Sequence, residues 1–353
     1  MFYYFSEYVF FSLIIKTMFL QEYTEKIKSG QNLNIAEAEY CLDLILSAAT
    51  EDSVIASFLK ALALKEESSE EIIGFARVMR ERGNSICPNH PKVVDTAGTG
   101  GGIPTFNIST AAAFVIAGAG VPVAKHGNRA VTSKSGSADV LLALGVCIDR
   151  PPEIAEQCLN EFGIAFLFAP VFHPSMKRVA HIRRQLGQRT IFNLLGPLTN
   201  PAGAPYQIIG VYSPEVTEKM AQSLMDLGTK RAWVFHSQDG LGELSLGAPA
   251  RVTEVKDSTL RTFDWDSREL GFSHIVATEY QGGLPEQNAG MIRSILEGQN
   301  KGPAKDVVIL NAAAALYVAD EGDFPEAIRK AEESIDSGAA LEKLLQLIQF
   351  YSN

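Results

Sequence analysis

Apolar residues recur at intervals of three and four positions between residues 18 and 83, which is the period of an amphipathic α-helix. The clearest helical runs extend from Ala36 to Ser47, from Glu51 to Leu64 and from Ser69 to Arg82. Ser69 is followed by two glutamates and an isoleucine, an order typical of a helix start with acidic residues in its first turn. No β-branched alternation interrupts these runs, so the pattern predicts a small N-terminal helical bundle domain over residues 18–83.

The pattern then changes to short apolar segments. Residues 84–92 are polar, contain two prolines and are predicted to be a linker. Beyond them, Ala- and Leu-rich helical stretches alternate with candidate strands at Val93–Val94, Val121–Ala124, Ala165–Phe168, Tyr206–Val211 and Ala232–Phe235. This alternation predicts a larger α/β domain over residues 93–353, with a central, mostly parallel sheet flanked by helices.

Two further stretches carry weaker patterns. The segment from Met176 to Leu186 is basic and helical, and we expect it to pack on the N-terminal bundle, so that part of residues 170–190 joins that domain. The tail from Asp306 through Asn311 to Leu345 is predicted to be a strand end followed by more helix.

The first twenty residues are apolar and aromatic, but they lack the features of a signal peptide. Glu7 and Lys16 interrupt the apolar run, no basic segment precedes it and no small-residue cleavage site follows it. Met18 offers a second start directly before the first amphipathic helix. We therefore interpret residues 1–17 as an extension and expect no membrane anchor.

Charge and cysteine content narrow the class of protein. A chain of 353 residues with 46% hydrophobic residues can bury a sizeable core, and its net charge of −10 favours a soluble protein. Binding along a nucleic acid needs a broad basic face, which this balance disfavours, although a local basic pocket is allowed. The four cysteines (Cys41, Cys87, Cys147 and Cys158) lack metal-ligand spacing and indicate free thiols in a reducing, cytoplasmic compartment.

A glycine-rich loop, Asp95-Thr-Ala-Gly-Thr-Gly-Gly-Gly102, follows the first candidate strand and leads through Thr105-Phe-Asn-Ile-Ser-Thr110 into an Ala-rich helix. Glycines allow close approach of a ligand, and N–H groups of such a loop and of a helix start bind anions. The alternatives are a tight turn and simple helix capping. The loop lacks the Walker ending and the third glycine of the dinucleotide fingerprint, so we predict a phosphate site of another kind.

A second polar segment, Lys125-His-Gly-Asn-Arg-Ala-Val-Thr-Ser-Lys-Ser-Gly-Ser137, follows the strand at Val121–Ala124. Three cations (Lys125, Arg129 and Lys134) and several small polar residues after a strand end suit a second anion site. His126 is a weak candidate for a general base, because no acidic partner is visible beside it. A positioning or packing role is favoured for this histidine.

Two more motifs leave alternatives open. The stretch from His173 to Arg184 holds Lys177, Arg178, Arg183 and Arg184; this is ordinarily a solvated helix face, but one arginine could clamp a substrate carboxylate. The residues alone do not choose among the four. Asp239-Gly-Leu-Gly-Glu243 follows the last candidate strand, and its two acids suit either an Mg²⁺ site or an Asp-Gly turn.

Together these motifs resemble the anthranilate phosphoribosyltransferases in order and spacing. The resemblance covers about residues 18–348 and is carried by Gly98-Thr-Gly-Gly, Thr105-Phe-Asn-Ile-Ser-Thr, Lys125-His-Gly-Asn-Arg, Phe192-Asn-Leu-Leu-Gly-Pro-Leu-Thr-Asn-Pro and Asn311-Ala-Ala-Ala-Ala-Leu. It implies a helical domain, an α/β domain and a homodimer formed through the helical part. It also implies transfer of the phosphoribosyl group of phosphoribosyl pyrophosphate to the amine of anthranilate, with Mg²⁺ present.

The resemblance further implies which residues bind each substrate. Anthranilate should be bound by Gly98, Asn128 and Arg183, with Arg183 facing its carboxylate, and Mg²⁺ by Ser109 and Glu243. Lys125 should act electrostatically, and no residue is expected to act as acid or base. Phosphoribosyl pyrophosphate should be bound by Gly98, Gly101, Gly102, Thr105, Asn107, Ile108, Ser109, Thr110, Lys125, His126, Gly127, Asn128, Arg129, Ala130, Val131, Thr132, Ser133 and Ser137.

The chain departs from the family pattern at two aspartates. Gly102 stands where the first loop usually has aspartate, and that loop is one residue shorter before Thr105; Gly242 replaces the second aspartate. We expect weaker Mg²⁺ binding as a result, unless Asp239 compensates through a water.

These losses motivate one alternative, a catalytically altered relative that binds nucleic acid. The other is a pyrimidine nucleoside phosphorylase of the same fold. Those enzymes carry Lys-x-Ser-x-Arg where this chain has Lys125-His-Gly-Asn-Arg129.

Overall fold

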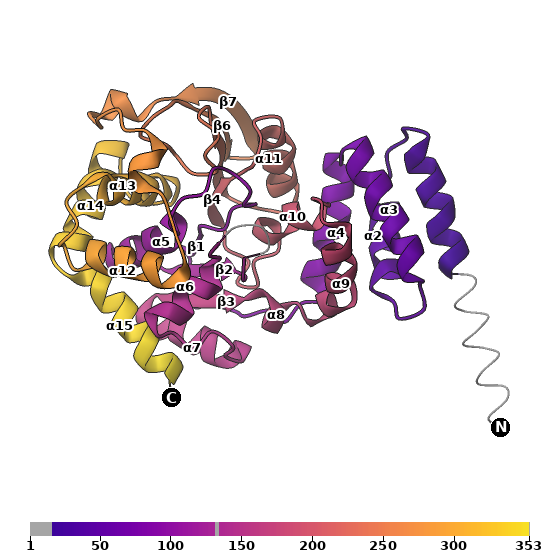
Figure 1. The fold of residues 1–353 in the computed structure, drawn as a ribbon, viewed down its shortest axis with the longest axis horizontal. Helices are drawn as coiled ribbons and strands as arrows, with labels where there is room; N and C mark the ends of the chain where they lie inside the picture. The colour runs from indigo at the N-terminus through magenta and orange to yellow at the C-terminus, as the bar shows by residue number, and fades with distance from the viewer. Residues whose placement is uncertain (1–15, 131–133, 353) are drawn as a thin grey trace. The chain divides into compact units, whose positions relative to one another are not determined.

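The computed structural model describes residues 16–130 and 134–352, and the chain divides into two compact units (Figure 1). The helical unit comprises the residues up to Gly83 together with His173–Thr199. The α/β unit comprises Asn84–Phe172 and the residues from Asn200 onward. Most of the expected N-terminal extension, residues 1–15, lies outside the described range, and residues 16 and 17 are part of a helix over residues 16–28.

The helical unit begins with helices that the sequence predicts within one residue at each end. After the helix over residues 16–28 come α2 (Ile35–Leu46), α3 (Asp52–Lys65) and α4 (Ser69–Glu81). Capping explains two of the starts: Asn34 and Glu37 form a capping box before α2, and Ser68 and Glu71 form one before α4. The later part of this unit contains η1 (Pro174–Met176), α9 (Lys177–Leu186), α10 (Phe192–Leu195) and η2 (Gly196–Leu198).

Helix α9 is held on the turn between α2 and α3 by its basic residues. The Arg178 guanidinium donates to the Asp52 carboxylate at 2.6 Å and to the Thr50 carbonyl at 2.5 Å. His181 lies 2.5 Å from the other oxygen of Asp52. Arg178 and His181 therefore stabilise the packing of α9 within the helical unit.

A seven-stranded sheet forms the middle of the α/β unit, in the order β3-β2-β1-β4-β5-β6-β7 (Figure 1). The pairs from β3 to β5 are parallel, and β6 and β7 are added antiparallel at one edge. The bounds are β1 (Val94–Asp95), β2 (Val123–Gly127), β3 (Ile164–Phe168), β4 (Tyr206–Gly210), β5 (Arg231–Ser237), β6 (Ala250–Lys256) and β7 (Thr259–Trp265). The predicted mostly parallel sheet is confirmed, whereas the β6–β7 hairpin was not predicted.

The direction of chain travel changes at one point in this sheet. From β1 the chain steps to β2 and β3 in one direction, and later from β4 to β5 in the other. Right-handed crossovers then place α5 (Ile108–Gly118) and α7 (Pro152–Phe162) on one face of the sheet and α11 (Val216–Asp226) on the opposite face. The neighbouring strands β1 and β4 therefore flank a topological switch point, where open α/β sheets bind ligands at the carboxyl ends of the strands.

The remaining helices complete the α/β unit. Helix α13 packs against α5, α14 and β4. Because almost every side chain of α13 is buried, its sequence has no amphipathic period, and the predicted strand end near Asp306 is wrong. The helices of the α/β unit whose bounds have not yet been given are α6 (Ser137–Leu144), α8 (Ala169–Phe172), η3 (Ser267–Leu270), η4 (Ala277–Tyr280), α12 (Pro285–Leu296), α13 (Pro303–Val318), α14 (Phe324–Asp336) and α15 (Ala339–Ser352).

Candidate phosphate and metal site

Four parallel strands bring their carboxyl ends, and the loops that follow, to one edge of the sheet. The first glycine loop follows β1, the basic segment begins with the last three residues of β2 (Lys125 to Gly127), and the acidic motif follows β5. The end of β4, at Gly210, lies next to the first loop, since the Thr99 N–H donates to the Gly210 carbonyl at 2.9 Å. The motifs selected from the sequence therefore meet at the switch point.

Lys125 connects the first two motifs directly. Its side chain is buried, and its Nζ donates to Thr96 Oγ1 at 3.0 Å and to Ser109 Oγ at 3.2 Å. Thr96 Oγ1 in turn donates to the Ser109 carbonyl at 3.0 Å. One ammonium group thus joins the β1 loop, the start of α5 and β2, so that Asn107 and Lys125 share one edge of the sheet.

Two carboxylates lie within reach of the charge on Lys125. Burial lowers the pKa of Lys125 to about 8, while the charges of Asp95 and Glu243 oppose this change. Burial raises the pKa of Glu243 to about 7, with Lys125 opposing, and the pKa of Asp95 to about 6. The cause of all three shifts is the loss of water around charged groups. An anion at this edge would meet a cation that has little other solvation.

Asp95 fixes the backbone around Lys125. Its Oδ1 accepts the Ala97 N–H at 3.1 Å and the His126 N–H at 3.2 Å, and the side chain is fully buried. The side-chain amide of Asn200 also favours the ionised carboxyl. Asp95 therefore ties the end of β1 to β2, a role that was not assigned from the sequence.

Helix α5 points its N-terminus at the same edge. Asn107 is the N-cap residue, but within the described part of the chain its side chain makes no capping hydrogen bond to the first turn. Simple capping, the alternative interpretation of this asparagine, does not apply. Ile108 and Thr110 are buried in the first turn, and Ser109 is half-buried. Uncapped N–H groups at a helix start favour an anion.

The two positions that depart from the family pattern lie against each other. We call Gly98, Gly102, Gly210 and Gly242 the glycine cluster. A Cβ atom added at Gly102 would lie 2.5 Å from the Gly242 nitrogen, and one added at Gly210 would overlap with the Gly242 carbonyl. A Cβ at Gly98 would lie 2.8 Å from the Gly210 oxygen. The loops after β1, β4 and β5 are thus packed backbone to backbone.

Both carboxylate oxygens of Asp239 accept hydrogen bonds within its own loop. Its Oδ1 accepts the Leu241 N–H at 3.3 Å, and its Oδ2 accepts the Ser245 hydroxyl at 2.5 Å. These bonds hold the Asp239–Gly240 turn, as the structural interpretation of this motif expected. Glu243 is the acid of the motif whose charge counteracts the lowering of the Lys125 pKa by burial.

A fully protein-built metal cage is absent from the described residues, which contain no group of three or more His, Cys, Asp or Glu side chains suited to a metal. Mg²⁺, however, is commonly bound through one or two carboxylates while substrate phosphates supply further oxygens. Ser109 and Glu243 both approach Lys125, one by a hydrogen bond and the other by charge. This oxygen donor set fits a metal that arrives with a phosphorylated substrate.

The basic loop, Lys125 to Ser137, is closed by a residue that sequence reasoning missed. Asp139 Oδ2 accepts the Ala130 N–H at 2.8 Å and the Gly136 N–H at 2.9 Å, and its Oδ1 lies 3.5 Å from Arg129. An acid three residues after a loop end and before an apolar run is a known helix-start signal, so Asp139 was detectable. The predicted residues Val131, Thr132 and Ser133 lie outside the described residues.

The other predicted residues of this edge are distributed as follows. Thr105 precedes α5, and its carbonyl packs against Gly282, where an added Cβ would overlap with it. Ser137 Oγ donates to the Asn128 carbonyl at 3.3 Å. His126 is buried, and Gly101 has a positive φ of 90°. The remaining predicted residues are exposed or half-buried; they are Gly98, Gly102, Gly127, Asn128, Arg129 and Ala130.

Arg183, expected at the anthranilate carboxylate, belongs to the helical unit. It is half-buried on α9, and its guanidinium lies over the Phe192 ring at 5.3 Å from the ring centre. Burial lowers the pKa of its guanidinium, which means that the charge has lost solvent. Its role toward the carboxylate stays a prediction, because Gly98 and Asn128 belong to the α/β unit.

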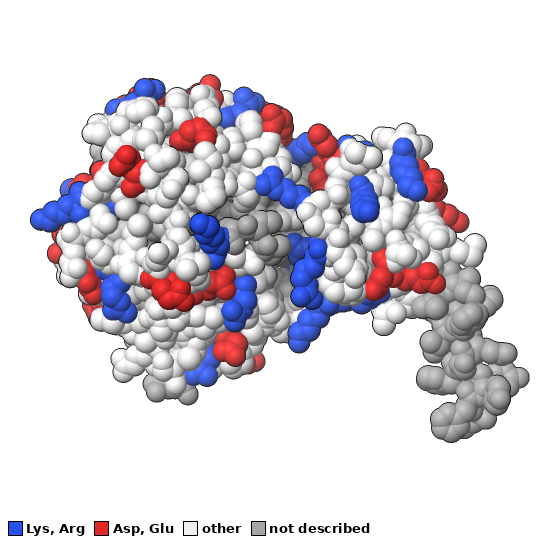
Figure 2. Space-filling view, viewed as in Figure 1, with Lys and Arg blue, Asp and Glu red and all other residues white. Residues whose placement is uncertain are grey.

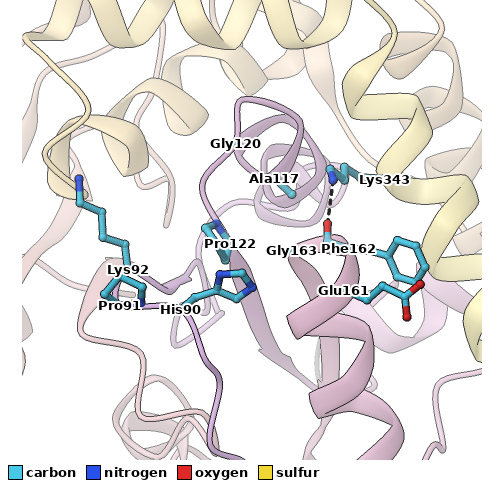
Figure 3. A pocket seen from close by; sticks show the side chains of 10 residues that line it. All are labelled: His90, Pro91, Lys92, Ala117, Gly120, Pro122, Glu161, Phe162, Gly163 and Lys343. Atoms are coloured by element: carbon cyan, nitrogen blue, oxygen red, sulfur yellow. Dashed lines mark hydrogen bonds between the residues drawn. The ribbon is translucent and has the colours of Figure 1, made fainter.

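A separate pocket of about 420 Å³ lies at the opposite edge of the sheet (Figure 3). It is bordered by the residues that precede β1, β2 and β3, such as Lys92, Pro122 and Gly163. Lys343 donates to the Phe162 carbonyl there at 2.8 Å. Because this pocket is at the amino ends of the strands, it is not part of the phosphate and metal site.

The surface charge fits this small, local cation site. Basic and acidic side chains are mixed over the visible face of the α/β unit in Figure 2, without a broad basic area. Among the described residues, none of the helices is long and apolar enough to cross a membrane.

Comparison with known proteins first defines the class. Residues 21–83 match the helical bundle domain of the glycosyl transferase family, and residues 90–341 match the α/β domain of the same family.

Relatives then identify the family more closely. Anthranilate phosphoribosyltransferases from Moorella thermoacetica and Desulfatibacillum aliphaticivorans are each 50% identical over 331 residues, which is 93% of this chain and 97% and 98% of theirs. The crystal structure of the Thermus thermophilus enzyme has a TM-score of 0.88 at 41% identity, covering 94% of this chain and 99% of that one. The Saccharomyces cerevisiae enzyme, in complex with phosphoribosyl pyrophosphate and magnesium, has a TM-score of 0.87 at 29% identity, covering 94% and 98%. This chain belongs to the anthranilate phosphoribosyltransferase family and is an enzyme of the glycosyltransferase class.

Proposed function

We propose that this enzyme transfers the phosphoribosyl group of phosphoribosyl pyrophosphate to the amine of anthranilate, with the chemistry at the switch point between β1 and β4. The observation that carries the proposal is the buried Lys125, whose Nζ joins Thr96 and Ser109 beside the uncapped start of α5. A buried cation next to a helix N-terminus is suited to a diphosphate. The relatives with this name, two of them 50% identical, support the transferase over the phosphorylase alternative.

The phosphoribosyl pyrophosphate would lie across both motifs. The N–H groups and hydroxyls at Asn107 to Thr110 bind one phosphate, and the basic loop with Lys125 and Ser137 binds the other phosphates and the ribose. The glycine loop at Gly98 to Gly102 lets the backbone approach closely. This assignment uses the side chains that meet at one edge and the uncapped helix start.

Mg²⁺ would be held by Ser109 and Glu243 together with the diphosphate of the substrate. Among related structures, one from Saccharomyces cerevisiae contains both phosphoribosyl pyrophosphate and magnesium. When bound, the ion neutralises charge that develops on the leaving diphosphate. Because Gly102 and Gly242 stand where the family pattern has aspartates, we infer that the protein contributes less to Mg²⁺ binding than a site with those two aspartates would.

The residues of this chain act by electrostatics and positioning. The anthranilate amine is already a neutral nucleophile, so no strong base is required, and His126 positions the β2 strand end. The barrier lies in separating the diphosphate anion from a cationic sugar. Lys125 and the α5 N–H groups stabilise the leaving group, and one such donor is worth about 3 kcal/mol. Asn128 and Gly98 would position anthranilate, with Arg183 binding its carboxylate.

We infer a homodimer formed through the helical unit. Met18 and Phe19, on the helix over residues 16–28, and Tyr40 of α2 are exposed apolar side chains, and Phe19 and Tyr23 both contact the Tyr40 ring edge-on. An exposed aromatic group on a helix is typical of a protein interface. Light scattering should give twice the chain mass, and Tyr40→Glu should shift the protein toward the monomer. A monomeric wild type would remove this inference.

We propose a cytoplasmic location because of the state of the cysteines. All of the cysteines (Cys41, Cys87, Cys147 and Cys158) are free thiols, which suits a reducing compartment. Small-molecule substrates, and no nucleic acid, are the partners we propose.

Loss of anthranilate fluorescence in the presence of phosphoribosyl pyrophosphate and Mg²⁺ tests the function. Lys125→Ala should fold normally and lose about a hundredfold or more in kcat. Arg183→Ala should mainly raise KM for anthranilate. Lys92→Ala, at the opposite edge of the sheet, is the control and should keep wild-type rates. Wild-type turnover in Lys125→Ala would refute the assigned role.

A further inference from the structure

Asn107 does not use its side chain as an N-cap asparagine normally does. At such a position the side-chain oxygen usually accepts an N–H of the first helical turn. Here, within the described residues, the Asn107 side chain makes no capping bond to α5. Something must hold the amide oxygen away from the helix that it precedes.

Two donors occupy that oxygen. Asn288 Nδ2 donates to Asn107 Oδ1 at 2.9 Å, and Ser135 Oγ donates to the same atom at 3.1 Å. The Asn107 amide nitrogen donates back to the Ser135 carbonyl at 3.1 Å. Since one oxygen has two acceptor positions, both are used by partners other than the helix.

Asn288 is itself firmly fixed. It is 1% exposed on α12, and its Oδ1 accepts the Gly283 N–H at 2.7 Å. The preceding Gly282 packs on the backbone at Thr105 and Phe106, where an added Cβ would overlap with the Thr105 carbonyl. The start of α12 is therefore seated on the segment that leads into α5, although 181 residues separate Asn107 from Asn288.

We propose that Asn288 is a positioning residue that keeps the N-terminus of α5 open for a phosphate of the substrate. It acts through Asn107, by holding the amide oxygen so that it cannot compete with the phosphate for the first-turn N–H groups. This proposal rests on the proposed function, since it deepens the assignment of the α5 start. Without Asn288, only Ser135 holds the Asn107 amide, and one acceptor position of its oxygen is free to turn toward the helix and cap it in the free enzyme.

Hydrogen exchange distinguishes this role from a merely structural one. In the ligand-free Asn288→Ala variant, amide exchange in the peptide that contains Ser109 should become slower, because a new cap protects the Ser109 N–H; the Thr110 N–H already donates to the Asn107 carbonyl at 3.0 Å. If Asn288 only stabilises packing, the same peptide should exchange faster. Faster exchange would overturn the proposal.

Substrate binding gives the second measurement. Asn288→Ala should weaken binding of phosphoribosyl pyrophosphate about tenfold, the order expected for one competing hydrogen bond. KM for anthranilate should stay within about twofold. Gln287→Ala is the matched control, because Gln287 accepts the Leu284 N–H at 2.9 Å on the same helix start but does not contact Asn107. It should bind phosphoribosyl pyrophosphate like the wild type.

A double-mutant cycle shows whether the effect passes through Asn107. In the Asn107→Ala background, Asn288→Ala should have no further effect on binding of phosphoribosyl pyrophosphate. An undiminished effect there would overturn the proposal. If Asn288→Ala does not fold, Asn288→Asp replaces it, because an aspartate keeps the acceptor for the Gly283 N–H but loses the donor to Asn107. The same double-mutant cycle then separates the effect of the lost donor from the effect of the added charge. A wild type that fails to bind phosphoribosyl pyrophosphate would instead refute the proposed function.

Discussion

The glycine cluster and the basic loop serve the same edge of the sheet but are constructed in opposite ways. In the cluster, Gly98, Gly210 and Gly242 pack backbone against backbone, and side chains contribute little. In the basic loop, side chains hold the shape: Asp139 accepts two loop N–H groups, and Lys125 spans to Ser109. Where backbone packs on backbone, as at Gly102 and Gly210, an added side chain would overlap with its neighbour, whereas a region built from side-chain bonds depends on particular functional groups.

Both positions at which this chain departs from the family aspartates belong to the glycine cluster. Gly102 and Gly242 lie in the backbone-packed region, and the space at Gly102 is filled by the backbone of the neighbouring loop. The charged groups of the site are instead Lys125, Asp95 and Glu243, on or beside the strand ends. The two regions should therefore respond differently to substitution.

The largest effect is expected for Gly210→Ala. The added Cβ would overlap with the Gly242 carbonyl, a backbone atom that cannot turn aside. We expect a loss of stability of about 1–3 kcal/mol from overpacking. Displacement of the loops by about 1 Å should cost activity about a hundredfold. Thermal unfolding and the fluorescence assay measure both.

Gly290→Ala is the control for this substitution. Apart from its chain neighbours and the backbone of its own helix, no described atom lies within 4 Å of a Cβ added there on α12. It should keep full activity and gain slightly in stability from helix propensity. Equal activity of the two variants would show that the backbone packing of the cluster is not needed.

An intermediate effect is expected for Asp139→Ala. The Ala130 and Gly136 N–H groups lose their acceptor, so the ends of the basic loop separate. KM for phosphoribosyl pyrophosphate should rise about tenfold, and stability should fall by about 1 kcal/mol, as for loss of a helix cap. Asp323→Ala, which removes the cap of the distant helix α14, should lose similar stability but no affinity. Equal affinity in both variants would contradict the comparison.

Much of the fold was predictable because its elements follow local patterns. The helices α2, α3 and α4 and the parallel strands were found from periodicity and from alternation with helices. The hairpin β6–β7 was missed because β7 is mostly exposed, and its residues read as a polar surface segment. Helix α13 was partly misassigned because a helix that is buried all round loses the period that identifies it.

The site was predictable only where it is continuous in sequence. The glycine loop and Glu243 follow strands and Lys125 lies near the carboxyl end of β2, so their convergence followed from parallel strand order. The contact between Gly102 and Gly242 depends on the pairing of β1 with β4, which no local pattern encodes. Asn288 reaches Asn107 across 181 residues, and Asp95 was read only as the start of a loop although it is a buried anchor.

An effect on stability and its pH dependence, rather than on rate, is expected for Asp95→Asn. Burial raises the pKa of Asp95 from 3.8 to about 6. Between these values the unfolded chain loses a proton that the folded protein keeps, so the folded wild type loses stability as the pH rises. The stability that the protonated Asp95 carboxyl adds to the folded protein is fully present below pH 3.8 and is lost as the pH rises through about 6.

Guanidinium unfolding between pH 4 and pH 7 measures this contribution. Across that window, the stability of the wild type relative to Asp95→Asn should fall by on the order of 2–3 kcal/mol. Parallel pH profiles for the two proteins would mean that the Asp95 carboxyl is not held in its neutral form by burial.

The smallest effect is expected where the cluster has room, at Gly242. No described atom lies within 4 Å of a Cβ added at Gly242, so Gly242→Asp should be accommodated beside Glu243. A second carboxylate should lower the Mg²⁺ concentration needed for half-maximal activity by several-fold, on the order of 1 kcal/mol. Titration of Mn²⁺ by electron paramagnetic resonance, with phosphoribosyl pyrophosphate present, should show the same change without turnover.

Gly242→Asn is the uncharged control for this substitution. Gly102→Asp should instead disturb the loop, because a Cβ added at Gly102 would lie 2.5 Å from the Gly242 nitrogen. If Gly242→Asp leaves metal affinity unchanged while Gly102→Asp improves it, the assignment of open and filled positions in the glycine cluster is wrong.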